Sequence, residues 1–112
     1  MNFNIEQKTG YTFIQVNKDK LDAIIAPVLK KYFSQLREED EEQIILDLSQ
    51  VKYIDSSGLT ALLLGSRKCK NLILVSPQGM VMKMLEISQL DHILTIAHGL
   101  EEAKHLVNME QV

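Results

Sequence analysis

Cysteine, long apolar runs and clustered basic residues are all scarce in this chain of 112 residues. The one cysteine, Cys69, excludes a disulfide framework, and it has no neighbouring histidine or cysteine that would suggest a zinc site. No apolar run approaches the ~20 residues that a membrane-spanning helix needs, and the first residues lack the charged-then-apolar pattern of a secretory signal. We therefore expect a cytoplasmic protein without a metal site and without membrane insertion.

The charge is weakly acidic and concentrated in one place. The chain has 12 basic and 15 acidic residues, and five of the acids follow one another in the segment Arg37–Glu42. We interpret this segment as a solvated connector in preference to a docking site for a basic partner. No basic stripe interleaved with aromatic residues occurs, so we expect no direct binding of nucleic acid.

Composition and hydrophobic pattern predict a single α/β domain spanning residues 1–112. Hydrophobic residues make up 46% of the chain and charged residues 24%, which is typical of a globular domain. Alternating apolar residues on either side of Gly10 predict an opening β-hairpin from Phe3 to Val16. Three apolar runs without alternation predict central strands of a largely parallel sheet, and these are 44–48, 72–75 and 93–97.

Helical patterns separate these strands. Proline is common in the first turn of a helix, where its missing amide hydrogen is not needed, so Pro27 predicts a helix that begins near Ala26. The apolar face of this helix is expected to comprise Val28, Leu29, Tyr32, Phe33 and Leu36. Further helices are predicted over 59–70, 80–87 and 100–109. The resulting order, ββαβαβαβα, implies a parallel sheet with crossover helices and one antiparallel pair contributed by the hairpin.

The loop after the strand 44–48 carries the most informative motif. It makes a short extended return through Val51, Tyr53 and Ile54, and enters a helix at Asp55-Ser56-Ser57-Gly58. Asp and Ser side chains cap helices by accepting hydrogen bonds from the free amides of the first turn. If Asp55 or Ser56 is the cap, Ser57 has a free, solvent-facing hydroxyl. Gly58, having no side chain, would let another molecule approach the backbone closely.

A phosphate on Ser57 would lie at the positive end of the helix, which stabilises it by about 1 kcal/mol. Asp55 opposes this stabilisation because like charges repel. Phosphorylation would change the local charge by about −2 without requiring a change of fold. The motif is therefore suited to switching a protein–protein contact, although it also serves as an ordinary helix start.

The segment from Ile44 to Leu59, with Leu62-Leu63 beyond it, resembles the signature of the STAS domain family, named after sulfate transporters and anti-sigma factor antagonists. The likeness extends along nearly the whole chain and includes Leu21-Asp22 and Val75-Ser76-Pro77. One departure is Gln89, which stands where the family commonly has a glycine.

The resemblance implies a bacterial anti-sigma factor antagonist that binds an anti-sigma factor and so frees a sigma factor. The anti-sigma factor is often also a serine kinase of the histidine-kinase-like ATPase fold. By that resemblance the kinase would phosphorylate Ser57 and abolish the contact, and a serine phosphatase would restore it. ATP and Mg²⁺ would belong to the kinase, so the chain itself needs no cofactor. Asp55, Ser56, Gly58 and Leu59 match the rim of the site and are candidates for partner contact.

The sequence also allows three other interpretations. An enzyme using Ser57 with His92, His98 or His105 is disfavoured, because the Gly-x-Ser-x-Gly elbow of α/β-hydrolases is absent. A phosphoacceptor domain using Asp47 lacks the neighbouring acidic pair that would hold a divalent metal, since only Glu6 is available near the first strand. The remaining alternative keeps the fold but makes the chain a non-switching subunit of a lipid-transport ATPase or a stress-signalling assembly.

Overall fold

The computed structural model describes residues 2–110, with the backbone alone at 38 and 108–110. Its main sheet has five strands in the order β1-β2-β4-β6-β7. The strands are β1 (Phe3–Lys8), β2 (Tyr11–Val16), β4 (Gln43–Asp47), β6 (Asn71–Val75) and β7 (Thr95–Ala97). β1 and β2 form the predicted antiparallel hairpin around Gly10, which has a φ of 88°, and every other pair in this sheet is parallel.

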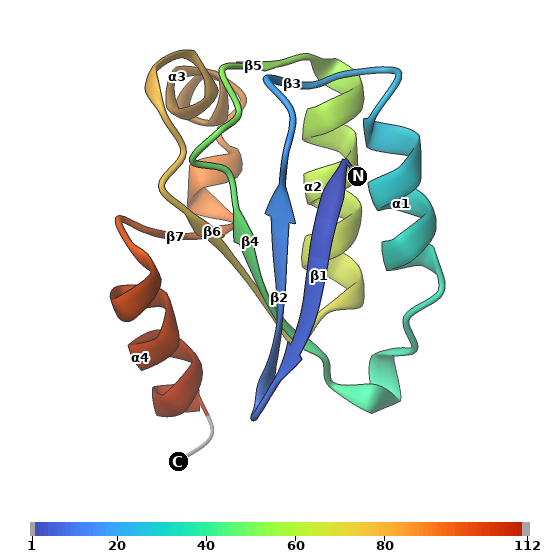
Figure 1. Ribbon diagram of the computed structural model, residues 1–112, viewed down its shortest axis with the longest axis vertical. Coiled ribbons are helices and arrows are strands. Elements are labelled where there is room, and N and C mark those ends of the chain that lie inside the picture. Colours follow the sequence, from blue (N-terminus) through green and yellow to red (C-terminus); the bar gives the residue numbers. More distant parts are fainter. Residues whose placement is uncertain (1, 111–112) are drawn as a thin grey trace.

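Helices cover both faces of the sheet (Figure 1). They are α1 (Ala26–Ser34), α2 (Ser56–Lys68), α3 (Gly79–Ile87) and α4 (Leu100–Glu110), with single 3₁₀ turns at Glu38–Asp40 and Leu90–His92. The larger core lies between the sheet and α1, α2 and α3, and its fully buried side chains include Phe33, Ile14 and Leu62. A smaller core, built around Ile45, Ile73 and Val107, lies under α4.

A second, two-stranded sheet was not predicted as separate elements. β3 (Lys20–Leu21) and β5 (Tyr53–Ile54) pair in parallel, with Leu21 opposite Ile54. β5 is the extended return expected before α2. In Figure 1 this small sheet lies at the end of the molecule where α1 and α2 both begin, beyond the carboxyl ends of the parallel strands.

The structure corrects several details of the sequence-based prediction. Val28 is 53% exposed, so it does not belong to the buried face of α1, and Leu36 lies beyond the end of that helix. β7 begins at Thr95, because Ile93 and Leu94 belong to the turn that follows the 3₁₀ segment; only Leu94 is buried. Gln89 has a left-handed φ of 63°, a conformation that explains why a glycine is favoured there.

Within residues 2–110, no helix has the length and apolar character needed to cross a membrane. The apolar residues in the first half of α2 are buried or half-buried. Ala61 and Leu62 are buried, and Leu59, Leu63 and Leu64 are half-buried against the larger core. Its apolar residues are therefore used for packing on the sheet and on α1.

Candidate functional site

The start of α2 is held in place by the small β3–β5 sheet. The backbone amides of Lys52 and Tyr53 both donate to the carbonyl oxygen of Asp19, at 2.6 and 3.0 Å. The amide of Asp55 donates to the carbonyl oxygen of Leu21 at 3.4 Å. Backbone hydrogen bonds thus connect the segment after β2 to the residue that precedes α2. Sequence reasoning missed this contribution of Asp19 and Leu21, because two-residue strands carry no periodic signal.

Asp55 is the N-cap of α2, which resolves the two possibilities left by the sequence. Its backbone is extended (φ −112°, ψ −172°), and its Oδ1 accepts a hydrogen bond from the amide of Gly58 at 3.1 Å. Ser56 and Ser57 are consequently the first two helical residues. An Asp cap also places a carboxylate at the positive end of the helix, where the macrodipole favours it.

Ser57 is half-buried, and is therefore less open than the sequence suggested, whereas Ser56 is exposed. No hydrogen bond of the Ser57 hydroxyl occurs within residues 2–110. Among the side chains that the structure describes, Asp91 Oδ1 is the oxygen that is both fully buried and without a hydrogen-bond partner. The Ser57 oxygen also has no partner, but it is not fully buried. It therefore keeps contact with solvent. It is an available hydroxyl in the first turn of a fixed helix.

Gly58 has a different role from the one expected. It is buried, and a Cβ built on it would clash with the carbonyl oxygen of Leu21 and would lie 2.5 Å from Cγ1 of Ile54. The absence of a side chain thus permits close packing against β3 and β5; it does not open the backbone to an incoming molecule. Among the predicted rim residues, Asp55 and Leu59 are half-buried, so Ser56 is the most accessible of them.

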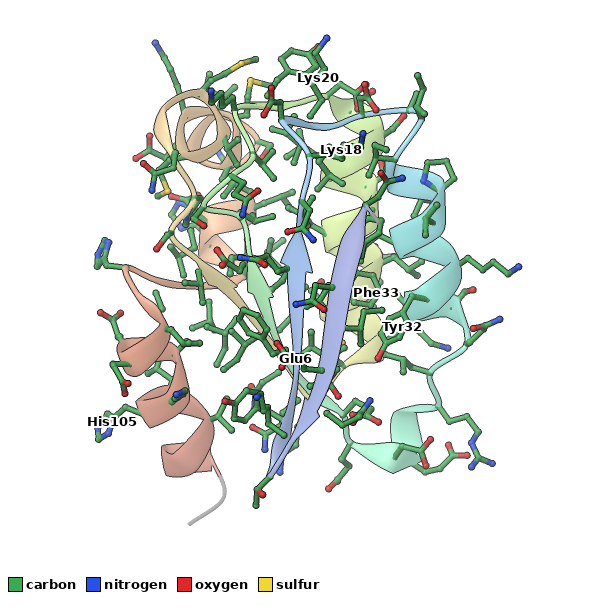
Figure 2. All side chains as sticks on the ribbon, in the orientation of Figure 1. Glu6, Lys18, Lys20, Tyr32, Phe33 and His105 are labelled. Atoms are coloured by element: carbon green, nitrogen blue, oxygen red, sulfur yellow. The ribbon has the colours of Figure 1, made fainter. Side chains whose placement is uncertain are left out.

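The residues of the competing interpretations are three exposed histidines and an aspartate that has hydrogen-bond partners of its own. His92, His98 and His105 are all exposed, and Figure 2 places His105 on α4, far from Lys20 of the small sheet. Asp47 accepts hydrogen bonds from the amide of Ser49 at 2.9 Å and from Nε2 of Gln15 at 3.2 Å, which tie the end of β4 to its surroundings. Among the residues that the structure describes, no three His, Cys, Asp or Glu side chains lie close enough together to hold a metal ion.

Cys69, at the other end of α2, is a free cysteine with a buried side chain. Burial raises the pKa of its thiol to about 12, and the nearby Glu42 adds to that rise. A thiol with such a pKa is almost wholly protonated at neutral pH, and the protonated form is a poor nucleophile. The cysteine is therefore part of the packing and contributes no chemistry to the helix start.

Comparisons with known proteins identify the family of this fold. The family model of the STAS domain matches residues 2–103. An anti-sigma-B factor antagonist from Staphylococcus aureus is 29% identical over 107 residues, covering 90% of this chain and 98% of the relative.

Solved structures share the fold. An anti-sigma factor antagonist from Thermotoga maritima matches with a TM-score of 0.79 and 26% identity, over 95% of this chain and 94% of that one. The Bacillus cell fate determinant SpoIIAA in its phosphorylated form matches with a TM-score of 0.70 and 22% identity, over 94% and 98% of the two chains. The family match spans the sheet, the small β3–β5 sheet and the capped start of α2 together, and the chain belongs to the STAS domain family.

Proposed function

We propose that this chain is an anti-sigma factor antagonist whose binding to an anti-sigma factor is switched by phosphorylation of Ser57. The relative from Staphylococcus aureus is named an anti-sigma-B factor antagonist and the one from Thermotoga maritima an anti-sigma factor antagonist, and both match the chain over most of its length. The observation that carries the proposal is the free hydroxyl of Ser57 in the first turn of α2, behind an aspartate cap that already occupies the amide of Gly58.

The partner in this proposal is an anti-sigma factor that is also a serine kinase of the histidine-kinase-like ATPase fold. In its unphosphorylated form the chain binds this partner and keeps it from the sigma factor. The kinase transfers the γ-phosphoryl group of ATP to the Ser57 oxygen, so that a phosphoserine and ADP are formed. A serine phosphatase hydrolyses the phosphoserine and restores binding.

The physical effect of the phosphate is local. It adds a charge of about −2 where the α2 dipole is positive, so the helix itself is not expected to unfold. Asp55 stands two residues before Ser57 and brings a like charge close to the phosphate, which limits the stabilisation. Phosphorylation should therefore change mainly the free energy of binding to the partner, because the surface of the partner must then accommodate a dianion.

Mass spectrometry after incubation with the anti-sigma factor kinase, ATP and Mg²⁺ tests this proposal. We expect one phosphate on the wild-type chain and on Ser56→Ala, and none on Ser57→Ala. A Ser57→Ala chain that still gains one phosphate would refute the assignment of the residue. A wild-type chain that neither gains phosphate nor binds the kinase would refute the switch and favour the non-switching subunit.

A second experiment separates a switch from a structural hydroxyl. Ser57→Asp should weaken binding to the kinase at least tenfold in isothermal titration calorimetry, while the melting temperature stays within about 2 °C of the wild type, since no hydrogen bond is lost. A large fall in melting temperature would show that the Ser57 side chain has a packing role instead.

A further inference from the structure

The turn between β3 and α1 is organised by one residue, Asp22. Its Oδ1 accepts hydrogen bonds from the amides of Ile24 and Ile25, at 3.1 and 3.3 Å. Its carbonyl oxygen accepts from the amides of Ile25 and Ala26, at 3.1 and 2.7 Å. An aspartate that binds the amides two and three residues later fixes a turn and caps the helix that follows. Ile25, at the N-cap position of α1, makes no side-chain cap, so Asp22 caps this end of the helix.

Asp22 directly follows the residue that contacts the start of α2. The carbonyl oxygen of Leu21 accepts a hydrogen bond from the amide of Asp55 at 3.4 Å, and it lies against Gly58. The planar peptide bond that carries this oxygen includes the nitrogen of Asp22, so the direction of the carbonyl is coupled to the direction of the turn. Figure 1 shows the turn at the end of the molecule where α2 begins. The Asp22 turn is therefore linked to the start of α2 through a single peptide unit.

The same segment contacts α2 a second time, through α1. A Cβ on Gly65 of α2 would lie 2.6 Å from Cε2 of Phe33, so the ring of Phe33 packs directly on that helix. Phe33 and Leu29 are buried in the larger core and hold α1 in place by apolar contacts. The hydrogen bond between Leu21 and Asp55, at 3.4 Å, is long by comparison with an ordinary amide–carbonyl bond of about 2.9 Å. If the turn loosens, the start of α2 should therefore be released before α1 is.

We propose that Asp22 is a positioning residue for the phosphorylation of Ser57. Its carboxylate fixes the turn, the turn fixes the carbonyl of Leu21, and that carbonyl holds the first turn of α2, which carries the Ser57 hydroxyl. A hydroxyl held in one position reaches the geometry of attack on a phosphoryl group more often than one on a fraying turn. The inference rests on the proposed function and deepens it, because it adds a residue more than 30 positions before Asp55-Ser56-Ser57-Gly58.

Three substitutions of Asp22 separate its hydrogen bonds from its charge. Asp22→Ala removes both. Asp22→Asn keeps an oxygen that can accept from the same amides, and Asp22→Glu keeps the charge on a side chain that is too long for this turn. Gly65→Ala is the matched control, since it strains the other end of α2 and leaves the Asp22 turn unchanged. Circular dichroism and melting temperature are measured first, and Asp22→Ala and Gly65→Ala should each melt about 4 °C below the wild type.

Hydrogen exchange followed by NMR tests the link without a kinase. The amide of Asp55 is held by Leu21 and that of Gly58 by the cap, so their exchange reports local opening of the start of α2. We expect both amides to exchange about tenfold faster in Asp22→Ala and Asp22→Glu than in the wild type. In Asp22→Asn and Gly65→Ala they should exchange within about threefold of the wild-type rate, because the turn is kept in both.

The rate of phosphorylation tests the consequence, with the kinase that phosphorylates the wild-type chain. We expect kcat to fall about tenfold in Asp22→Ala and Asp22→Glu, with KM within about twofold of the wild-type value. Such a split indicates a hydroxyl that is badly placed in a complex that still forms. Asp22→Asn and Gly65→Ala should keep both constants within about twofold of the wild type. Loss of a direct contact between the Asp22 carboxylate and the kinase would instead raise KM, and Asp22→Asn would then resemble Asp22→Ala.

The outcomes distinguish this inference from the proposed function. If the wild type is phosphorylated and Asp22→Ala is phosphorylated as fast, or if its amide exchange is unchanged, the inference is overturned and the proposed function stands. Equal slowing in Asp22→Ala and Gly65→Ala would also overturn it, because the cause would then be general instability. If Asp22→Ala does not fold, the comparison of Asp22→Asn with Asp22→Glu decides in the same way. If the wild type gains no phosphate, the proposed function falls, and the role of Asp22 in phosphorylation falls with it.

Discussion

The two ends of α2 are fixed by different kinds of contact. At its start, Gly58 lies against the backbone carbonyl of Leu21, and Asp55 closes the first turn. Near its end, a Cβ on Gly65 would lie 2.6 Å from Cε2 of Phe33 and 2.9 Å from Cδ2 of Leu72, both of them side-chain atoms. Side chains can change rotamer to relieve a close contact, whereas a hydrogen-bonded backbone segment cannot move without disturbing its partners.

This difference indicates which end is held in a precise position. The start of α2 carries Ser57 and is positioned by backbone atoms of a segment more than 30 residues away in the sequence. The end of α2 contributes mainly to the stability of the core. An added methyl group at the start of α2 should therefore lower the free energy of unfolding more than one near its end, where neighbouring side chains can change rotamer.

Gly58→Ala is expected to have the largest effect. The added methyl group meets the carbonyl of Leu21 and Cγ1 of Ile54, so the β3–β5 sheet has to separate from α2. We expect a loss of about 3 kcal/mol in the free energy of unfolding, measured by urea denaturation. Gly99→Ala is the matched control, since a Cβ there has nothing within 4 Å, and it should change stability by less than about 0.5 kcal/mol. Equal stabilities of the two variants would show that the start of α2 is not rigidly held.

Gly65→Ala should be less damaging, and it tests the other side of the comparison. The ring of Phe33 and the methyl of Leu72 can shift, and alanine favours the helix over glycine by about 1 kcal/mol. The net loss is expected to be about 1 kcal/mol in the same urea experiment. A double variant with Phe33→Leu should show strong non-additivity, because the smaller side chain makes room for the methyl group. Simple additivity would contradict contact between these residues.

Asp55→Ala removes the cap from the start of α2. Its Oδ1 accepts from the amide of Gly58, and loss of such a cap costs about 1 kcal/mol. Asp55→Asn should retain most of the stability, because an asparagine oxygen can accept the same hydrogen bond. Thermal melts of the three proteins at equal concentration provide the measurement. If alanine and asparagine were equally destabilising, the carboxylate charge would matter more than the hydrogen bond.

The sequence was sufficient to predict the parallel sheet and the start of α2 at Asp55-Ser56-Ser57-Gly58. Apolar runs without alternation, such as 44–48, are characteristic of strands covered on both faces, and Asp55-Ser56-Ser57-Gly58 has the composition of a helix start. Those signals are local, so they can be recognised without the fold. The boundary of β7 was misjudged because Ile93 and Leu94 extend an apolar run while belonging to a turn.

The role of Gly58 could not be predicted, because it depends on a contact between distant segments. Leu21 and Ile54 lie against the glycine because β3 and β5 pair, and the spacing of these residues in the sequence does not predict that pairing. The exposure of Val28 had a similar origin. Its helical spacing fitted the apolar face of α1, but the residues of this helix that are buried are Ala26, Leu29 and Phe33.

At neutral pH the smallest effect on stability is expected from Cys69, beyond the last turn of α2. Burial raises its thiol pKa from the ordinary value of 9.0 to about 12, with a further contribution from Glu42. The unfolded chain therefore loses the thiol proton near pH 9, and the folded chain keeps it until about pH 12. It follows that this group leaves stability unchanged below pH 9 and lowers it progressively as the pH rises between these values.

Reaction with a thiol reagent at pH 8 measures this protection directly. The native chain should react at least a hundredfold more slowly than the chain in 6 M guanidinium chloride, since both the thiolate fraction and access are reduced. Glu42→Gln removes the smaller cause of the shift and should accelerate the native reaction only slightly. Gly65→Ala loosens the packing of the last turns and should accelerate it more, whereas Gly99→Ala should not. If the thiol reacted equally fast in the native and the denatured chain, the end of α2 would open freely. The two ends of the helix would then differ in mobility as well as in the kind of contact that fixes them.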